Sequence, residues 1–135
     1  MNAFVRCTPL LLALAAAGAL AQAPQAPQEL PKDLHGRWSA VGGGRASAQP
    51  FDLENIQRKD AGSFAARLSW TGADPKCTIR YQPITGTVTP AGLGFEAKTP
   101  CNEGVKAELT RGSGGWLGMA TVTAKSSTVV ELTAK

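Results

Sequence analysis

Two acidic residues, Asp52 and Glu54, have a spacing that acid–base chemistry or calcium binding could use. They alternate with Phe51 and Leu53, so a strand in this segment would point both carboxylates to one face. The two apolar side chains would then occupy the opposite face, which makes the acidic face the solvent side. The pair is therefore better explained as a solvated strand surface than as a catalytic or metal-binding site.

The other residues that could do chemistry lack the partners that such chemistry needs. His35 is the sole histidine and has no nucleophile motif beside it. Ser126 and Ser127 are not enclosed by a Gly-x-Ser-x-Gly elbow. The glycine-rich clusters at 42–44 and 112–115 do not continue into Gly-Lys-Ser/Thr, so both are expected to be turns. The sequence predicts a protein that is not an enzyme and that uses no metal and no cofactor.

The N-terminal segment has the features of a signal peptide over residues 1–21. Arg6 precedes an uninterrupted run of Leu, Ala and Gly over 10–20, which is too short to span a bilayer as a helix. The small residues of Ala19-Leu20-Ala21 place the cleavage site after Ala21. Cys7 lies before the apolar run, so it is not a lipid-attachment cysteine at a cleavage site. We therefore expect a periplasmic or secreted bacterial protein with no stable membrane anchor.

Cysteine usage agrees with export, whereas the charge balance decides little. The mature chain keeps Cys77 and Cys101, and an even number in an oxidising compartment predicts a disulfide between them. Removing Arg6 from the 14 Lys and Arg leaves 13 against 10 Asp and Glu. The longest basic run, Arg58-Lys59, has no aromatic residues interleaved with it, so nucleic-acid binding is not expected.

The mature chain divides into a leader and one folded domain. Residues 22–33 are rich in Pro and Gln, a composition typical of a flexible segment. Residues 34–135 show no sustained helical period, whereas alternation of apolar and polar residues recurs between Gly- and Pro-rich turns. The clearest case is 63–70, where Phe64, Ala66, Leu68 and Trp70 share one face.

This pattern predicts an all-β domain built as an antiparallel up-and-down meander of eight or nine strands. The expected strands are 36–41, 50–58, 63–70, 77–82, 84–89, 92–98, 105–111, 116–124 and 127–134. Short connections favour closure into a small barrel over a two-sheet sandwich, because a closed barrel leaves no exposed edge.

The opening segment, Leu34 to Trp38, resembles the Gly-x-Trp first strand of lipocalin-like and avidin-like (calycin-type) barrels. Gly62-Ser63-Phe64 is similar to a Gly-x-Phe element of the avidin pattern. The resemblance implies that Trp38 closes one end of a barrel. It does not extend to the avidin ligand site, because Ala40 and the glycine cluster follow the tryptophan and Leu68 stands where a ligand-binding tyrosine would be. Biotin binding is therefore not predicted.

A second resemblance is to small secreted bacterial inhibitors of metalloproteases. These combine a flexible N-terminal segment, a Gly-x-Trp-like strand and a disulfide-bonded barrel. The resemblance implies that 22–33 could enter a protease cleft. This chain departs from the pattern because Cys77 and Cys101 lie late in the sequence, whereas an early pair is expected in that family.

The aromatic residues lie on separate predicted strands, so barrel closure would gather several of them inside. They could simply fill the interior, or they could surround a small apolar or amphipathic ligand whose polar group is bound near the mouth. The candidate ligand-binding residues are Trp38, Trp70, Tyr81, Arg80 and Trp116. The leading hypothesis is a non-enzymatic exported binding protein for such a ligand. The alternatives are a secreted protease inhibitor that uses its leader and barrel surface, with a secreted or periplasmic protein as partner, and a structural or assembly protein.

Overall fold

The computed structural model describes residues 29–42 and 47–135. The predicted signal peptide, 1–21, and the first part of the predicted leader, 22–28, lie outside the described residues. Of the glycine cluster at 42–44, only Gly42 is described, and it lies in a turn with φ of 77°.

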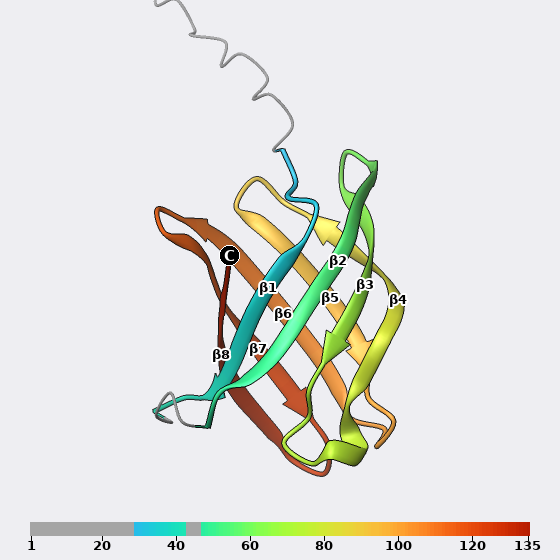
Figure 1. The fold of residues 1–135 in the computed structure, drawn as a ribbon, viewed down its shortest axis with the longest axis vertical. Coiled ribbons are helices and arrows are strands. Elements are labelled where there is room, and N and C mark those ends of the chain that lie inside the picture. Colours follow the sequence, from blue (N-terminus) through green and yellow to red (C-terminus); the bar gives the residue numbers. More distant parts are fainter. Residues whose placement is uncertain (1–28, 43–46) are drawn as a thin grey trace, which may run out of the picture.

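The described residues form eight strands that close into a barrel (Figure 1). Each strand pairs antiparallel with the next, and the last pairs with the first. A 3-10 turn, η2 (Pro75–Cys77), precedes the fourth strand. The structure therefore confirms the all-β meander and its closure. The strands are β1 (Leu34–Ala40), β2 (Gln49–Asp60), β3 (Ser63–Trp70), β4 (Ile79–Val88), β5 (Gly92–Lys98), β6 (Gly104–Gly112), β7 (Gly115–Thr123) and β8 (Ser127–Ala134).

The segments predicted as two strands, 77–82 and 84–89, form the single strand β4 with Pro83 inside it. Proline has no N–H to donate to a strand pairing, so its presence suggested a break. β5 pairs with β4 only from Gly86 onward, which leaves one side of β4 without a partner strand at Pro83. A proline is tolerated in such a position.

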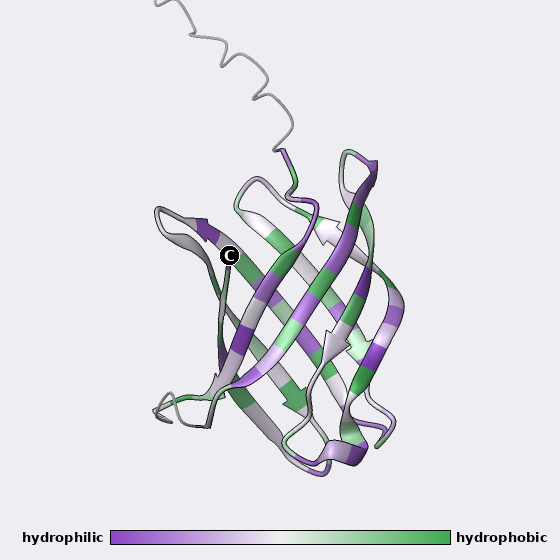
Figure 2. Cartoon of the chain, viewed as in Figure 1, coloured by the Kyte–Doolittle hydropathy of each residue, from purple (hydrophilic) through white to green (hydrophobic). Residues whose placement is uncertain are grey.

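The alternation of the sequence separates the inside of the barrel from the outside (Figure 2). In β3, Phe64, Ala66, Leu68 and Trp70 are buried, whereas Arg67 between them is exposed. The interior is filled by side chains that are almost wholly removed from solvent. The largest of these are Trp70, Phe51, Phe64, Leu34, Leu53, Leu68, Ile79, Leu109, Leu132, Val105 and Val130.

Two stacked indoles lie toward the end of the barrel where β1 and β3 finish, the lower end in Figure 1. The ring centroids of Trp38 and Trp70 are 5.1 Å apart with an interplanar angle of 6°. Phe51 packs on Trp70 at 5.7 Å, and Nε1 of Trp38 donates a hydrogen bond to the carbonyl of Thr71 at 2.9 Å. This arrangement is compatible with the end-closing role that the calycin-type resemblance implies for Trp38.

Gly36 in β1 makes room for one of these rings. A Cβ at this position would lie 2.5 Å from two ring carbons of Phe51 and 2.6 Å from the carbonyl oxygen of Thr133. The absence of a side chain at Gly36 therefore lets the Phe51 ring, which packs on Trp70, lie against β1.

The weakest part of the wall is the seam between β4 and β5. These strands pair only at Gly86–Phe95, Thr87–Gly94 and Val88–Leu93, whereas every other pair of neighbouring strands has at least five paired positions. The predicted disulfide, Cys77–Cys101, is present beyond the unpaired stretch, with a Cα–Cα distance of 5.0 Å. It joins η2 to the turn between β5 and β6, so it fastens the seam where the strand pairing is missing.

The last residues of the predicted leader contact the barrel. Leu30 packs against the core. The N–H of Ile56 donates to the carbonyl of Lys32 at 2.8 Å, and the N–H of Asn55 donates to Oδ1 of Asp33 at 2.9 Å. Nothing in the described part of the chain forms a helix with the length and hydrophobicity that a bilayer crossing requires.

Candidate outer groove

The five residues proposed from the sequence as a ligand site do not form one site. Trp38, Trp70 and Trp116 are buried, Trp116 also borders the groove described below, and only Trp38 and Trp70 contact each other as a stacked pair. Arg80 and Tyr81 are exposed on β4. The pairing of β3 with β4 shifts between Leu68 and Trp70, and Tyr81 has φ of 49° at this shift. The side chains that fill the interior agree with the filled-core interpretation.

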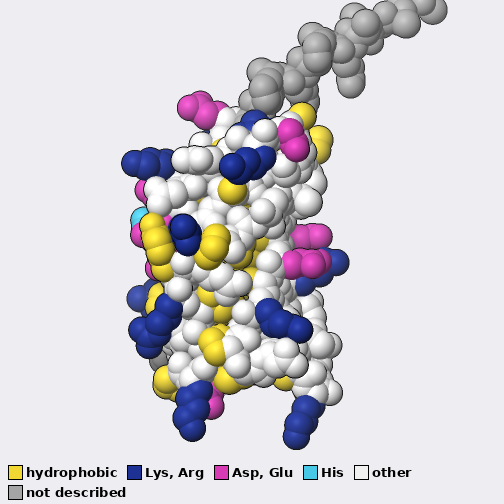
Figure 3. All heavy atoms as spheres, turned by 90° about the vertical axis from the view of Figure 1, so that its right-hand side faces the viewer, with side chains coloured by type: hydrophobic (Ala, Val, Ile, Leu, Met, Phe, Trp, Pro, Cys, Tyr) yellow, Lys and Arg dark blue, Asp and Glu magenta, His cyan; other side chains and the backbone are white. Residues whose placement is uncertain are grey.

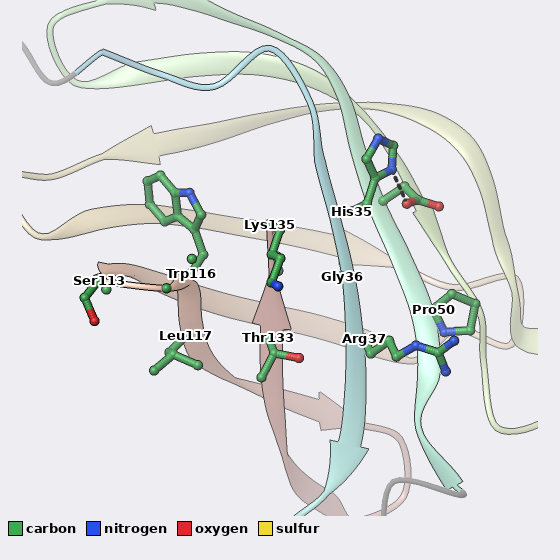
Figure 4. A pocket seen from close by; sticks show the side chains of 14 residues that line it. His35, Gly36, Arg37, Pro50, Ser113, Trp116, Leu117, Thr133 and Lys135 are labelled. Atoms are coloured by element: carbon green, nitrogen blue, oxygen red, sulfur yellow. Dashed lines mark hydrogen bonds and ion pairs between the residues drawn. The ribbon is translucent and has the colours of Figure 1, made fainter.

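A groove lies on the outside of the wall, across β2, β1, β8 and β7 (Figure 4). We call it the outer groove, and its volume is about 810 Å³. Its lining residues come from four strands and from the turn between β6 and β7. They are His35, Gly36, Arg37, Pro50, Asp52, Gly112, Ser113, Gly114, Gly115, Trp116, Leu117, Thr133, Ala134 and Lys135.

Strand register brings the polar residues of the groove together. His35 is opposite Asp52 on β2, and on its other side its backbone exchanges two 3.0 Å hydrogen bonds with Lys135. Two residues further on, Arg37 is opposite Pro50 on β2 and Thr133 on β8. Alternate residues of a strand share a face, so these side chains form two adjacent outward-facing rows across the wall.

The groove contains charged side chains of both signs: Arg37 and Lys135 are positive, and Asp52 is negative. Nδ1 of His35 lies 2.7 Å from Oδ1 of Asp52. The hydrogen bond with Asp52 is the main reason that the pKa of His35 is raised above its usual value of 6.5, and the negative charges of nearby carboxylates add to it. Within the described residues, Arg37 and Lys135 form no ion pair. The guanidinium of Arg37 and the ammonium of Lys135 are thus available to an anion.

An apolar strip continues from the groove along the same wall. Among the described residues, five large apolar side chains are exposed. One is Tyr81, and the other four are aliphatic and at least 46% exposed. Leu117 lines the groove and Met119 follows it on the same face of β7. Met119 is paired with Glu131 and Thr121 with Val129, which makes Met119 and Val129 diagonal neighbours. We call this set the aliphatic stripe: Leu117, Met119, Val129 and Val41.

Val41 lies in the turn directly after β1. The preceding residue, Ala40, is paired with Val130 of β8, so Val41 follows the end of β1 beside β8. Exposed apolar side chains that gather on one wall mark a contact surface more often than scattered ones do.

Sequence reasoning did not find the outer groove. From the sequence, Asp52 was expected on a solvated face and His35 was expected to stand alone. Nothing in the local sequence links these two residues, which are 17 positions apart. Only the strand register shows that they are neighbours. Among the described residues, no group of three or more His, Cys, Asp or Glu side chains could hold a metal ion.

The closed eight-stranded barrel defines the class of the protein as a small antiparallel β-barrel, a fold compatible with calycin-type binding proteins. No protein-family model matches the chain, and comparison with curated proteins and with solved structures gives no significant match.

Proposed function

We propose that the chain is an exported binding protein that holds an amphipathic anion in the outer groove, on the outside of the barrel. The observation that carries this proposal is the combination, in one groove, of Arg37 and Lys135, which have no ion partner among the described residues, with the apolar side chains of Leu117 and Pro50. The groove volume of about 810 Å³ lies in the range of small-molecule sites. The disulfide supports export, since such bonds persist in oxidising compartments.

The chemistry of the groove assigns a role to each part of the ligand. The planar guanidinium of Arg37 can bind a carboxylate through two parallel hydrogen bonds, and the ammonium of Lys135 adds a second positive charge. Leu117 begins the aliphatic stripe, which gives an apolar chain a surface to cover. The small amphipathic ligand expected from the sequence is therefore retained in this proposal, but its site is outside the wall and not inside the barrel.

The proposal is tested by calorimetric titration of the mature protein with decanoate, a carboxylate on an apolar chain. Arg37→Gln should weaken binding about tenfold, because a hydrogen bond to a charged group contributes about 1.5 kcal/mol or more. Lys125→Gln, which removes an exposed charge from the turn between β7 and β8, should leave the affinity unchanged. Equal affinities for the wild type and Arg37→Gln would refute a role for the groove.

Decanoate binding should depend on pH through His35. A raised pKa keeps the imidazole protonated, and therefore positive, to a higher pH than usual. Affinity should accordingly increase by a few-fold as the pH falls from about 9 to about 6, a range in which the carboxylate stays ionised. Asp52→Asn removes the partner that raises the pKa, so it should move this increase to lower pH. A pH profile identical in His35→Gln and the wild type would contradict the assignment.

Protease inhibition through the leader is a second candidate, favoured by one observation. The contacts of Lys32 and Asp33 with β2 fix the end of the leader to the barrel, so the preceding residues would leave from a fixed point. Deleting 22–28 keeps these contacts and should abolish inhibition of a secreted metalloprotease while the thermal stability stays the same. Inhibition that survives the deletion would exclude a leader-based mechanism.

A further inference from the structure

The outside of β2, β3 and β4 carries a second polar and aromatic cluster, which the outer groove does not include. We call Tyr81, Asn55 and Arg67 the tyrosine cluster. Nδ2 of Asn55 donates a hydrogen bond to the hydroxyl of Tyr81 at 3.0 Å, and the guanidinium carbon of Arg67 lies 5.3 Å from the centre of its ring. The N–H of Tyr81 donates to Oγ of Ser69 at 3.2 Å. The ring is half exposed, yet its face, its hydroxyl and its backbone are all held.

Two left-handed residues place this cluster. Asn55 and Tyr81 have φ of 53° and 49°, a conformation that side-chain-bearing residues seldom adopt. Each lies at a register shift of its strand, one on either side of β3. Asn adopts this conformation more readily than most residues, whereas at a residue such as Tyr81 it costs about 1–3 kcal/mol and is found most often at functional sites. Bulges also redirect side chains. The fold therefore sustains a local cost at the exposed aromatic side chain.

A shallow groove of about 390 Å³ lies beside the cluster and includes Asn55 and Arg67 in its lining. Ala65 of β3 is paired with Gln57 on one side and Thr85 on the other. Its methyl group is shorter than both neighbours, so it forms the low point between them. Pro83 adds an apolar surface to the groove wall.

The cluster offers hydrogen-bond donors and positive charge. The Tyr81 oxygen accepts the bond from Asn55, which leaves its own O–H free to donate. Arg67 and Arg80 form no ion pair within the described residues. Figure 3, which faces the right-hand side of the barrel in Figure 1, shows Lys and Arg side chains spread over this face with apolar side chains between them, and Asp and Glu side chains near its top and edges. Two carboxylates border the cluster, since Glu54 is opposite Arg67 and Asp33 accepts a hydrogen bond from the N–H of Asn55. The guanidinium groups and the Tyr81 hydroxyl suit a partner that supplies negative charge and hydrogen-bond acceptors, together with some apolar surface.

We propose that the tyrosine cluster is a docking surface for an acidic segment of a partner protein. A carboxylate of the segment binds the guanidinium of Arg67 and the hydroxyl of Tyr81, and an adjacent apolar side chain lies over Ala65 and Pro83. Tyr and Arg are the residue types that contribute most at the centres of protein interfaces. This surface is on a different part of the wall from the outer groove, so the inference does not rest on the proposed function.

The test uses NMR titration of the ¹⁵N-labelled mature protein with a blocked peptide of sequence Glu-Leu-Glu-Leu-Glu, and with its Gln-for-Glu analogue as the uncharged reference. The Glu peptide should shift the amides of 54–57, 65–69 and 80–85, and the Gln analogue should bind at least fivefold more weakly. Tyr81→Phe and Arg67→Gln should each reduce the affinity at least threefold. Glu54→Gln should increase it, because Glu54 is the β2 residue opposite Arg67.

Arg111→Gln is the matched control, since Arg111 also lies over an aromatic ring, 5.9 Å from that of Trp116, but outside the tyrosine cluster. It should leave the affinity unchanged. Equal binding of the two peptides, or equal losses in Arg67→Gln and Arg111→Gln, would overturn the proposal. Lower melting temperatures of Tyr81→Phe and Arg67→Gln with unchanged peptide affinity would also overturn it and would assign the cluster to stability alone.

Discussion

Replacing Trp70 by alanine is expected to lower the free energy of unfolding by about 4 kcal/mol. The indole is 1% exposed, stacks on Trp38 and packs against Phe51, so truncation removes apolar contacts and leaves a cavity. Equilibrium unfolding in urea measures the loss. Val129→Ala on the aliphatic stripe is the control and should cost less than about 0.5 kcal/mol.

The same variant tests whether the interior is filled in the native protein. A cavity lined by apolar side chains stays dry and can bind a small apolar molecule. Indole should therefore raise the melting temperature of Trp70→Ala and leave that of the wild type unchanged. A loss below about 1 kcal/mol, or an equal effect of indole on both proteins, would mean that the interior is not packed as the structure describes.

Removing the disulfide is expected to have the next largest effect. Cys77 and Cys101 close a loop with a sequence separation of 24, for which the chain-entropy relation gives about 3 kcal/mol. In a domain of this size, that loss corresponds to a melting temperature lower by roughly 10–20 °C. The double variant Cys77→Ser, Cys101→Ser can be compared with the wild type in dithiothreitol, and the two should melt alike.

The position of the disulfide adds a local expectation. Because β4 and β5 pair at only three positions, loss of the bridge should raise hydrogen exchange first in 79–85 and 96–98. The amides of β6 and β7, which share nine paired positions, should remain protected. Uniform deprotection across the barrel, or an unchanged melting temperature, would show that the bridge does not fasten the seam.

The sequence was sufficient to predict the fold because each strand satisfies the same simple rule. Alternating residues such as Phe64, Ala66, Leu68 and Trp70 face one side, and turn residues separate one such segment from the next. The main departure from the predicted pattern was at Pro83, where one strand was expected to be two and where the missing partner on the β5 side could not be read from β4 alone. Local rules thus predict the elements, but they leave the extent of each strand pairing undetermined.

The candidate sites depend on register, which explains why the sequence did not reveal them. His35 and Asp52 become neighbours only when β1 and β2 are aligned, and Lys135 joins them through β8. Tyr81 and Arg80 are residue types suited to binding, but from the sequence they were expected near the mouth of the interior. In the structure both side chains are on the outside, and Tyr81 has a left-handed backbone conformation. A glycine at this position would have indicated such a conformation in the sequence, but a tyrosine does not.

Lipocalin-like and avidin-like proteins, which the opening segment resembles, set the expectation of a ligand inside the barrel. Here the Gly-x-Trp segment contributes to both sides of the wall. Gly36 and Trp38 pack the interior, whereas His35 and Arg37 point to the outer groove (Figure 4). One short strand can therefore belong to a filled core and to an external binding surface.

The most direct test of the account is to locate decanoate on the ¹⁵N-labelled mature protein by NMR titration. Binding in the outer groove predicts amide shifts confined to 35–37, 50–52, 112–117 and 133–135, and it predicts unchanged indole N–H signals for Trp38 and Trp70. Shifts of those two indole signals without changes in the groove would place the ligand inside the barrel and would contradict the account.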